Sequence, residues 1–173
     1  MSLVKLNIAR GVTGTLPTSN YTSGITEADQ WRITTSFNGS SNPITANWER
    51  NDTVFDKIGT GMSESSGIFT FPSTGIYKVE FLILSNRNDE SLYSAAKINI
   101  TENNSSYTER ATGYSHIGVD SAWSGAYVQT NIDVTDTTNI KVQFGVVNQA
   151  ATDFIGNTNA NKTTVTFTRL GDT

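Results

Sequence analysis

The sequence predicts an all-β protein built as a two-sheet antiparallel sandwich, and three observations support that prediction. Residues 31–170 divide into about nine to eleven short segments with alternating or continuous apolar residues, a number that one sandwich domain accommodates. No window of about 11 residues shows the apolar spacing of an amphipathic helix. Charged residues make up only 16% of the 173-residue chain. Thr, Ser, Asn and Gly take their place, as in single-domain β proteins with many turns.

The chain is organised around residues 66–84, which read as two strands joined by a tight turn. Pro72 cannot donate to a strand ladder and Gly75 tolerates a positive φ, so the chain reverses between them. The second strand has one fully apolar face, and Leu82 and Leu84 make its other face apolar as well. The first face consists of Tyr77, Val79, Phe81 and Ile83. A strand that is apolar on both faces is predicted to be central in its sheet.

Residues 1–30 are predicted to form an extended N-terminal arm. Its first residues alternate, with Val4, Leu6 and Ile8 on one face of a strand. Residues 11–24 then contain mostly Gly, Pro, Ser and Thr, which bury little apolar surface. An apolar strand without a core of its own indicates a partner chain, so Val4, Leu6 and Ile8 are predicted to attach the protein to a larger assembly.

Residues 31–173 are predicted to form the head domain, a single sandwich. Its strands follow the apolar segments, and Asn38-Gly39 and residues 156–161 are expected to be turns. The predicted interior residues are Phe69, Phe71, Tyr77, Val79, Phe81, Ile132, Val142, Phe144, Val165 and Phe167.

A family resemblance agrees with this organisation. The pattern Gly67-x-Phe69, then Pro72, then Gly75-x-Tyr77-x-x-x-Phe81 resembles the central signature of the jelly-roll heads shared by complement component 1 subcomponent q and the tumour necrosis factor family. Residues 54–58, 125–136 and 164–170 resemble three further strands of those heads. The sequence departs from the family pattern at Val79, where the family has Phe, and at Thr135, where it has Gly before the turn aspartate.

The resemblance implies a jelly roll that assembles as a homotrimer and has no enzymatic activity. The Thr/Asn/Gly-rich arm is similar to those of tailed-phage fibre and head-decoration proteins that carry such heads. We therefore expect a bacteriophage virion protein, made in the host cytoplasm, whose arm contacts other virion proteins and whose head binds a host-surface glycan or protein. The alternatives are a soluble carbohydrate-binding module and a glycan hydrolase.

Composition argues against several other classes. A net charge of −4 and the absence of a basic stripe argue against nucleic acid. No apolar run reaches the roughly 18 residues of a membrane span, and the N-terminus lacks the apolar core of a signal peptide, so we expect neither membrane insertion nor ordinary secretion. The chain has no cysteine, which removes disulfides, thiol nucleophiles and thiolate metal sites.

The sequence marks no catalytic, cofactor or metal site. His116 is the only histidine, and a lone loop histidine is usually solvated. The aspartates lie beside turn residues, where they typically hydrogen-bond the backbone. Some complement-like heads bind calcium near the trimer axis, but no calcium-loop spacing occurs here. The Gly59-x-Gly61 pair lacks the third glycine and the helix of a dinucleotide fingerprint.

Aromatic residues gather in the least regular part of the chain, residues 107–127. Tyr107, Tyr114 and Trp123 are candidate surface-binding residues, because exposed rings can stack on sugars or anchor interfaces. A position in the sandwich core is an equal alternative for Trp123 and the favoured one for Tyr127.

Overall fold

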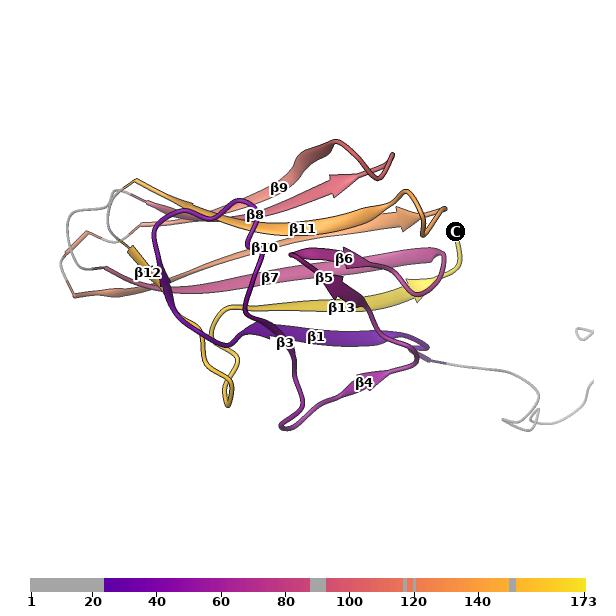
Figure 1. Ribbon diagram of the computed structural model, residues 1–173, viewed down its shortest axis with the longest axis horizontal. Coiled ribbons are helices and arrows are strands. Elements are labelled where there is room, and N and C mark those ends of the chain that lie inside the picture. The colour runs from indigo at the N-terminus through magenta and orange to yellow at the C-terminus, as the bar shows by residue number, and fades with distance from the viewer. Residues whose placement is uncertain (1–23, 88–92, 117, 120, 150–151) are drawn as a thin grey trace, which may run out of the picture.

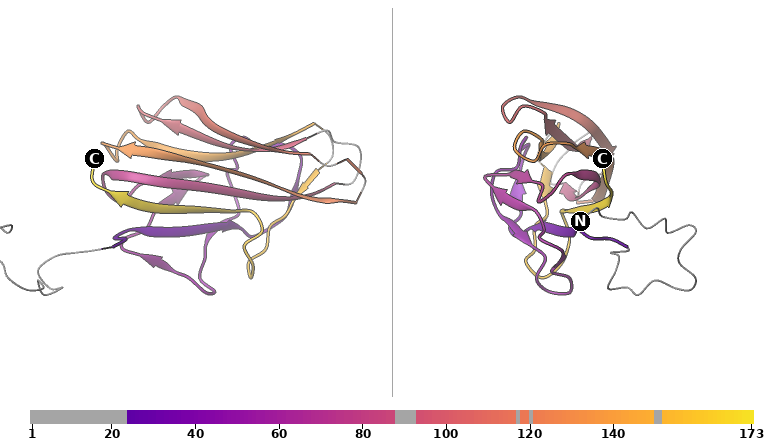
Figure 2. Two further views of the ribbon diagram at one scale, coloured as in Figure 1. Left: turned by 180° about the vertical axis from the view of Figure 1, so that it is seen from behind. Right: turned by 90° about the vertical axis from the view of Figure 1, so that its right-hand side faces the viewer.

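The computed structural model describes residues 24–87, 93–116, 118–119, 121–149 and 152–173. Every regular element in these ranges is a β-strand, and the strands form two antiparallel sheets packed face to face (Figures 1 and 2). The predicted all-β sandwich is therefore confirmed. No helix in the described ranges is long and apolar enough to cross a membrane.

The larger sheet has eight strands in the order β2-β12-β7-β13-β1-β3, with β10 paired to β7 and β4 paired to β1. Its strands are β1 (Ala28–Ile33), β2 (Phe37–Asn38), β3 (Trp48–Arg50), β4 (Lys57–Ile58), β7 (Gly75–Arg87), β10 (Trp123–Val134), β12 (Thr152–Phe154) and β13 (Thr164–Gly171).

The smaller sheet has five strands in the order β5-β6-β11-β8-β9. They are β5 (Ser63–Ser65), β6 (Ile68–Thr70), β8 (Ser94–Thr101), β9 (Tyr107–Ser115) and β11 (Lys141–Asn148).

Strand β7 is central in the larger sheet, as its two apolar faces predict. It pairs with β10 along the whole of Trp123–Val134 without a register shift, and β13 lies on its other side. One face of β7 points into the sandwich and is fully buried. The other face looks away from the core, so the apolar residues on it are left at the surface.

The signature residues act together at the turn before β7. A side chain at Gly75, whose φ is 143°, would overlap with Arg169 and the carbonyl oxygen of Gly171, so close approach of β13 requires glycine there. The Tyr77 ring packs on Phe71 with ring centroids 4.8 Å apart. Burial raises the pKa of the Tyr77 hydroxyl, which lies 2.9 Å from the Ser73 hydroxyl.

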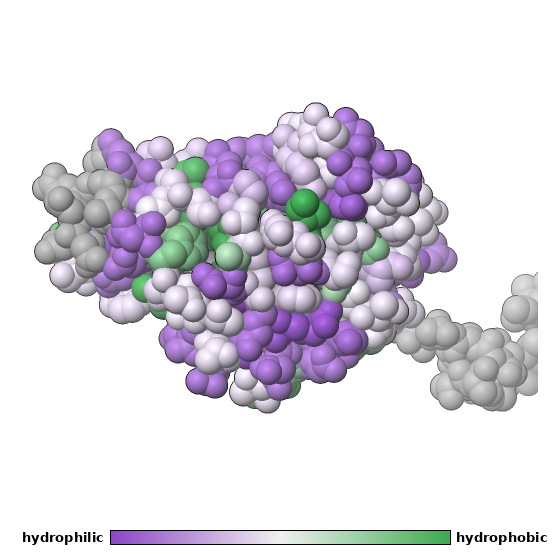
Figure 3. Space-filling view, in the orientation of Figure 1, coloured by the Kyte–Doolittle hydropathy of each residue, from purple (hydrophilic) through white to green (hydrophobic). Residues whose placement is uncertain are grey.

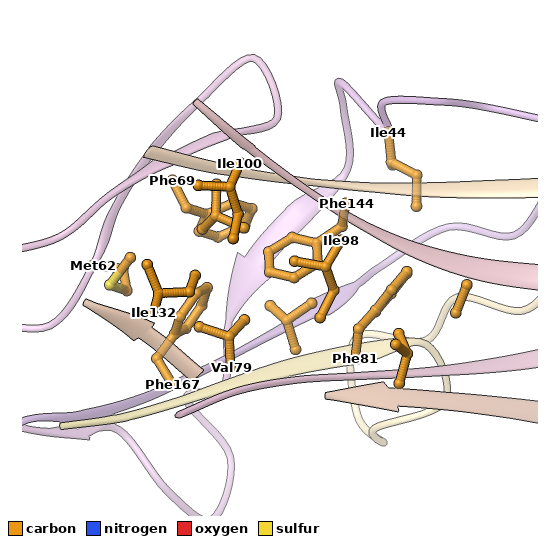
Figure 4. Packing of buried hydrophobic residues seen from close by; sticks show 14 of the residues in the cluster. Ile44, Met62, Phe69, Val79, Phe81, Ile98, Ile100, Ile132, Phe144 and Phe167 are labelled. Carbon is orange, nitrogen blue, oxygen red and sulfur yellow. The ribbon is translucent and has the colours of Figure 1, made fainter. Parts of the chain in front are cut away.

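Aromatic rings from both sheets fill the core (Figure 4). Phe69 of β6 contacts Trp31, Trp48, Phe144 and Phe167, with ring centroids 5.1–5.5 Å apart. Every residue predicted to be interior is buried. Strand alternation and the turn residues therefore located the core correctly.

A buried arginine joins β1 to β3 and to the segment that follows β3. The Arg32 side chain is only 1% exposed and donates to Glu49, Asn51, Asp52 and Thr53 over 2.7–3.1 Å. Because a buried guanidinium needs most of its donors satisfied, this network fixes residues 49–53 over the edge of the sheet. Sequence analysis did not identify it.

Strand β1 begins at Ala28, so the larger sheet takes in residues 28–30, which sequence analysis assigned to the arm. The backbone N–H of Arg169 donates to the Glu27 carbonyl, which places the start of β1 and the C-terminal residues at one end of the sandwich (Figure 1). The predicted attachment residues Val4, Leu6 and Ile8 lie outside the described residues.

Candidate functional site

The best candidate site is the outer face of the larger sheet where β10, β7 and β13 lie side by side. A shallow hollow of about 180 Å³ opens there. It is lined by Glu80, Leu82, Tyr127, Thr164 and Thr166. In contrast, the face seen in Figure 3 is mainly hydrophilic, and its hydrophobic residues form small separate patches.

Strand alternation explains why apolar groups lie on this outer face. Ala126 and Val128 of β10 point into the core, so Tyr127 between them must point outward, and it is 50% exposed. The prediction that Tyr127 is a core residue is therefore wrong. Leu82, directly opposite Tyr127 in the β7 ladder, is 39% exposed. The two side chains form an apolar pair in the middle of the sheet.

Charged groups border this apolar pair. The Tyr127 hydroxyl donates to the Glu80 carboxylate, and Lys78 Nζ lies 2.8 Å from the same carboxylate. The hydrogen bond to Glu80 raises the pKa of Tyr127 to about 12, since ionising the phenol would lose it. Burial opposes ionisation of Glu80, but the hydrogen bonds from Lys78 and Tyr127 outweigh it and lower the pKa of the carboxyl.

Replacing Tyr127 with phenylalanine should raise the pKa of Glu80. The substitution removes a donor that stabilises the charged carboxylate and keeps the ring. NMR titration of the Glu80 side-chain carboxyl measures the change. Tyr93→Phe, which alters an exposed tyrosine just before β8 of the smaller sheet, is the control. An equal shift in both variants, or none in Tyr127→Phe, would contradict the assigned hydrogen bond.

Strands β9 and β10 form one long margin of the molecule. In the described part of the chain, β9 pairs only with β8 and β10 only with β7, so each is an edge strand. The two edges meet near the end of β9, where the hydroxyls of Ser115 and Ser124 are hydrogen-bonded. A side chain at Gly113 would overlap with the Tyr127 carbonyl oxygen, so the two backbones are in close contact there.

Further along this margin, β9 and β10 separate and leave a groove of about 740 Å³. Ile100, Ile132 and Ile140 supply its apolar lining, and each is nearly buried. Its polar lining residues are Glu102, Arg110, Thr130, Asn131, Asp133, Thr135, Asp136 and Asn139.

The structure places one of the three predicted surface aromatics, Tyr107, far from Tyr114. Tyr114 is 67% exposed and packs edge-on against Tyr93, with ring centroids 5.6 Å apart. Trp123 is 62% exposed, so the alternative of a core position is wrong. Tyr107 begins β9, seven residues before Tyr114 and therefore roughly 23 Å away. The Tyr107 hydroxyl is buried without a hydrogen-bond partner among the described residues, and burial raises its pKa.

The potentially catalytic residues are scattered. In the described part of the chain, no three His, Asp or Glu side chains come together as a metal site. Asp136 accepts hydrogen bonds from Thr138 N at 2.7 Å and Asn139 Nδ2 at 2.6 Å, which hold the turn between β10 and β11 and keep the pKa of its carboxyl low. Asp136 thus forms this turn although Thr135 precedes it instead of glycine.

Comparison with solved structures identifies the fold. The chain resembles murine APRIL, in a crystal structure at pH 5.0, with a TM-score of 0.62 and 12% identity over 83% of this chain and 98% of that one. It also resembles Eiger TNF from S. frugiperda, with a TM-score of 0.63 and 11% identity over 84% and 93%. No protein-family model and no curated protein sequence matches the chain. The fold is a tumour necrosis factor-like jelly roll.

Proposed function

We propose that this protein is a non-enzymatic structural head that forms a homotrimer through the outer face of β10, β7 and β13. The observation that carries the proposal is the exposed pair Leu82 and Tyr127 at the centre of that face. A sheet with one solvated face normally alternates apolar-in and polar-out. Apolar residues on the outward side of the central strand favour burial against another molecule.

The residues around the apolar pair Leu82 and Tyr127 fit a protein interface better than a small-molecule site. The hollow is shallow, and its other residues, Thr164, Thr166 and Glu80, form a polar rim. A buried apolar centre with a polar rim is the usual anatomy of protein interfaces, where aromatic residues are enriched.

Three copies are the expected number because the resemblance noted in the sequence implies a trimer. A closed ring also uses the outer face of each copy without leaving a free complementary surface, whereas an open arrangement would continue into a filament.

Leu82→Asp should convert the trimer into monomers, because it places a carboxylate in the centre of the interface. Sedimentation at micromolar concentration should show wild-type protein at three times 18.8 kDa and the variant at 18.8 kDa. Circular dichroism should show that the variant keeps its fold, since Leu82 lies outside the core. The matched control is Ser65→Asp, an exposed residue on β5 of the smaller sheet. A monomeric wild type, or a trimeric Leu82→Asp variant, would refute the proposal.

We further propose that the head belongs to a bacteriophage virion, as a fibre tip or capsid decoration attached through residues 1–30. The similarity of the arm to those of phage fibre and decoration proteins supports this role. At the opposite end of β9 from Tyr107, the exposed pair Tyr93 and Tyr114 offers stacking surface for a host glycan or protein. Antibody labelling of particles in electron micrographs tests the location, and a glycan array tests the binding.

A further inference from the structure

We propose that the groove between β9 and β10 binds residues 3–10 of a second copy of this chain. The inference rests on the proposed homotrimer, because it names a contact that residues 3–10 make with another copy in that assembly. The experiment below is arranged so that the two proposals can fail separately.

The groove has the size and lining of a binding site for an extended segment. Its volume of about 740 Å³ lies within the range of roughly 300–1,000 Å³ found for ligand sites. Isoleucines from β8, β10 and the turn before β11 line it, and the bulge in β9 places Arg110 at its margin. The Arg110 guanidinium pairs with the Glu102 carboxylate at 2.6 Å.

Both walls of the groove are edge strands. The side of β10 that faces away from β7, and the side of β9 that faces away from β8, have no strand partner in the described part of the chain. A regular edge strand offers backbone donors and acceptors to an added strand. An extended segment is therefore a better occupant than a compact ligand.

The apolar pattern of residues 3–10 fits this site. Val4, Leu6 and Ile8 alternate along the segment, so a strand there would direct all three toward the isoleucine lining. Lys5 would project from its opposite face, whereas Arg10, which continues the alternation, would point toward the groove.

Charge supports the same occupant. Residues 1–23 contain Lys5 and Arg10 and no acidic residue. The groove contains Asp133, Asp136 and Glu102, and Arg110 is its only cation among the described residues that line it. Aspartates are ionised near neutral pH, and hydrogen bonds from Thr138 and Asn139 lower the pKa of Asp136 further, so the groove presents negative charge to the arm.

The position of β1 favours a second copy over the same chain. Glu27 accepts hydrogen bonds from the backbone N–H groups of Thr60 and Gly61, which tie the chain to the β4 side of β1, whereas the groove lies beyond β10. Ala28 pairs with Thr168 of β13, Thr168 pairs with Lys78 of β7, and Lys78 pairs with Asn131 of β10. Ala28 and Asn131 are therefore three strand spacings, about 14 Å, apart. In the proposed trimer a neighbouring copy packs over this outer face, which brings a second chain within reach of the arm.

Disulfide trapping between two differently tagged chains tests the proposal. One full-length chain carries Leu6→Cys and the other carries Thr135→Cys, at the groove. Because the natural chain has no cysteine, a disulfide between the two tags can only join two copies. After co-expression and mild oxidation, a non-reducing gel should show the mixed covalent dimer. Ser63→Cys, an exposed residue on β5, replaces Thr135→Cys in the control and should give none.

A charge exchange tests the specificity of the contact. Arg10→Glu should reduce the yield of the mixed dimer about two- to fivefold, the range expected for one exposed ion pair. Asp133→Lys in the groove-bearing chain should restore it. If neither substitution changes the yield of the mixed dimer, the role of charge in the proposal is overturned.

Two other results would overturn the groove inference itself. One is an equal yield with Ser63→Cys, or no mixed dimer at all. The other uses one chain that carries both Leu6→Cys and Thr135→Cys and is diluted with wild-type protein. If its disulfide forms only within that chain, the partner is not a second copy. Sedimentation of the same samples separates the two proposals. A trimer without the disulfide refutes only the groove inference, and a monomer refutes the proposed trimer.

Discussion

Replacing Phe81 with alanine should lower the free energy of unfolding by about 3–5 kcal/mol. The Phe81 ring is fully buried and packs against Phe144 of the other sheet, with ring centroids 5.2 Å apart. The substitution leaves a cavity between the sheets that the surrounding rings fill only in part. Equilibrium unfolding in urea, monitored by circular dichroism, measures the loss.

The matched control removes an aromatic ring from the surface. Tyr114→Ala should change the unfolding free energy by about 1 kcal/mol or less, because most of that ring already faces water. If both variants lose the same stability, the assignment of Phe81 to the core is wrong.

Arg32→Ala should lower the free energy of unfolding by about 2–3 kcal/mol, because it removes a buried side chain that donates to four neighbours. The substitution leaves Asn51, itself buried, without the donor from Arg32 and leaves a cavity beneath residues 49–53. Thermal or urea unfolding measures the loss, and hydrogen exchange should show faster opening of residues 49–53.

Asp52→Ala is the control for the arginine. The Asp52 carboxylate is largely solvated, so its ion pair with Arg32 should contribute about 1 kcal/mol or less. A large loss from Asp52→Ala together with a small one from Arg32→Ala would contradict the view that burial of the guanidinium makes this network important.

The core was predictable from sequence because period-two alternation and turn residues are local signals. Val79 of β7 illustrates this, since the polar residues Lys78 and Glu80 on either side of it fix which face it occupies. The prediction of jelly-roll connectivity rested instead on a short sequence signature. The similarity to solved structures then supported that prediction.

The candidate site was less predictable because it depends on which faces are inward. Leu82 was noted as apolar on the second face of β7, but nothing in the sequence shows whether that face meets a second layer or solvent. Tyr127 was assigned to the wrong face, although its buried neighbours Ala126 and Val128 gave a usable alternation signal. The Arg32 network joins residues 17–21 positions apart, and no spacing rule predicts it.

One glycine allows the backbones of β9 and β10 to come into contact beside the groove. The contact between Gly113 and the Tyr127 carbonyl marks the place where the margin of the sandwich changes from closed to open. A larger residue at position 113 would push β9 away from β10 and extend the opening toward Ser115. A substitution at this position, which is outside the groove lining, could therefore lengthen or shorten the groove without changing its lining residues. Related heads could in this way come to bind segments of different length.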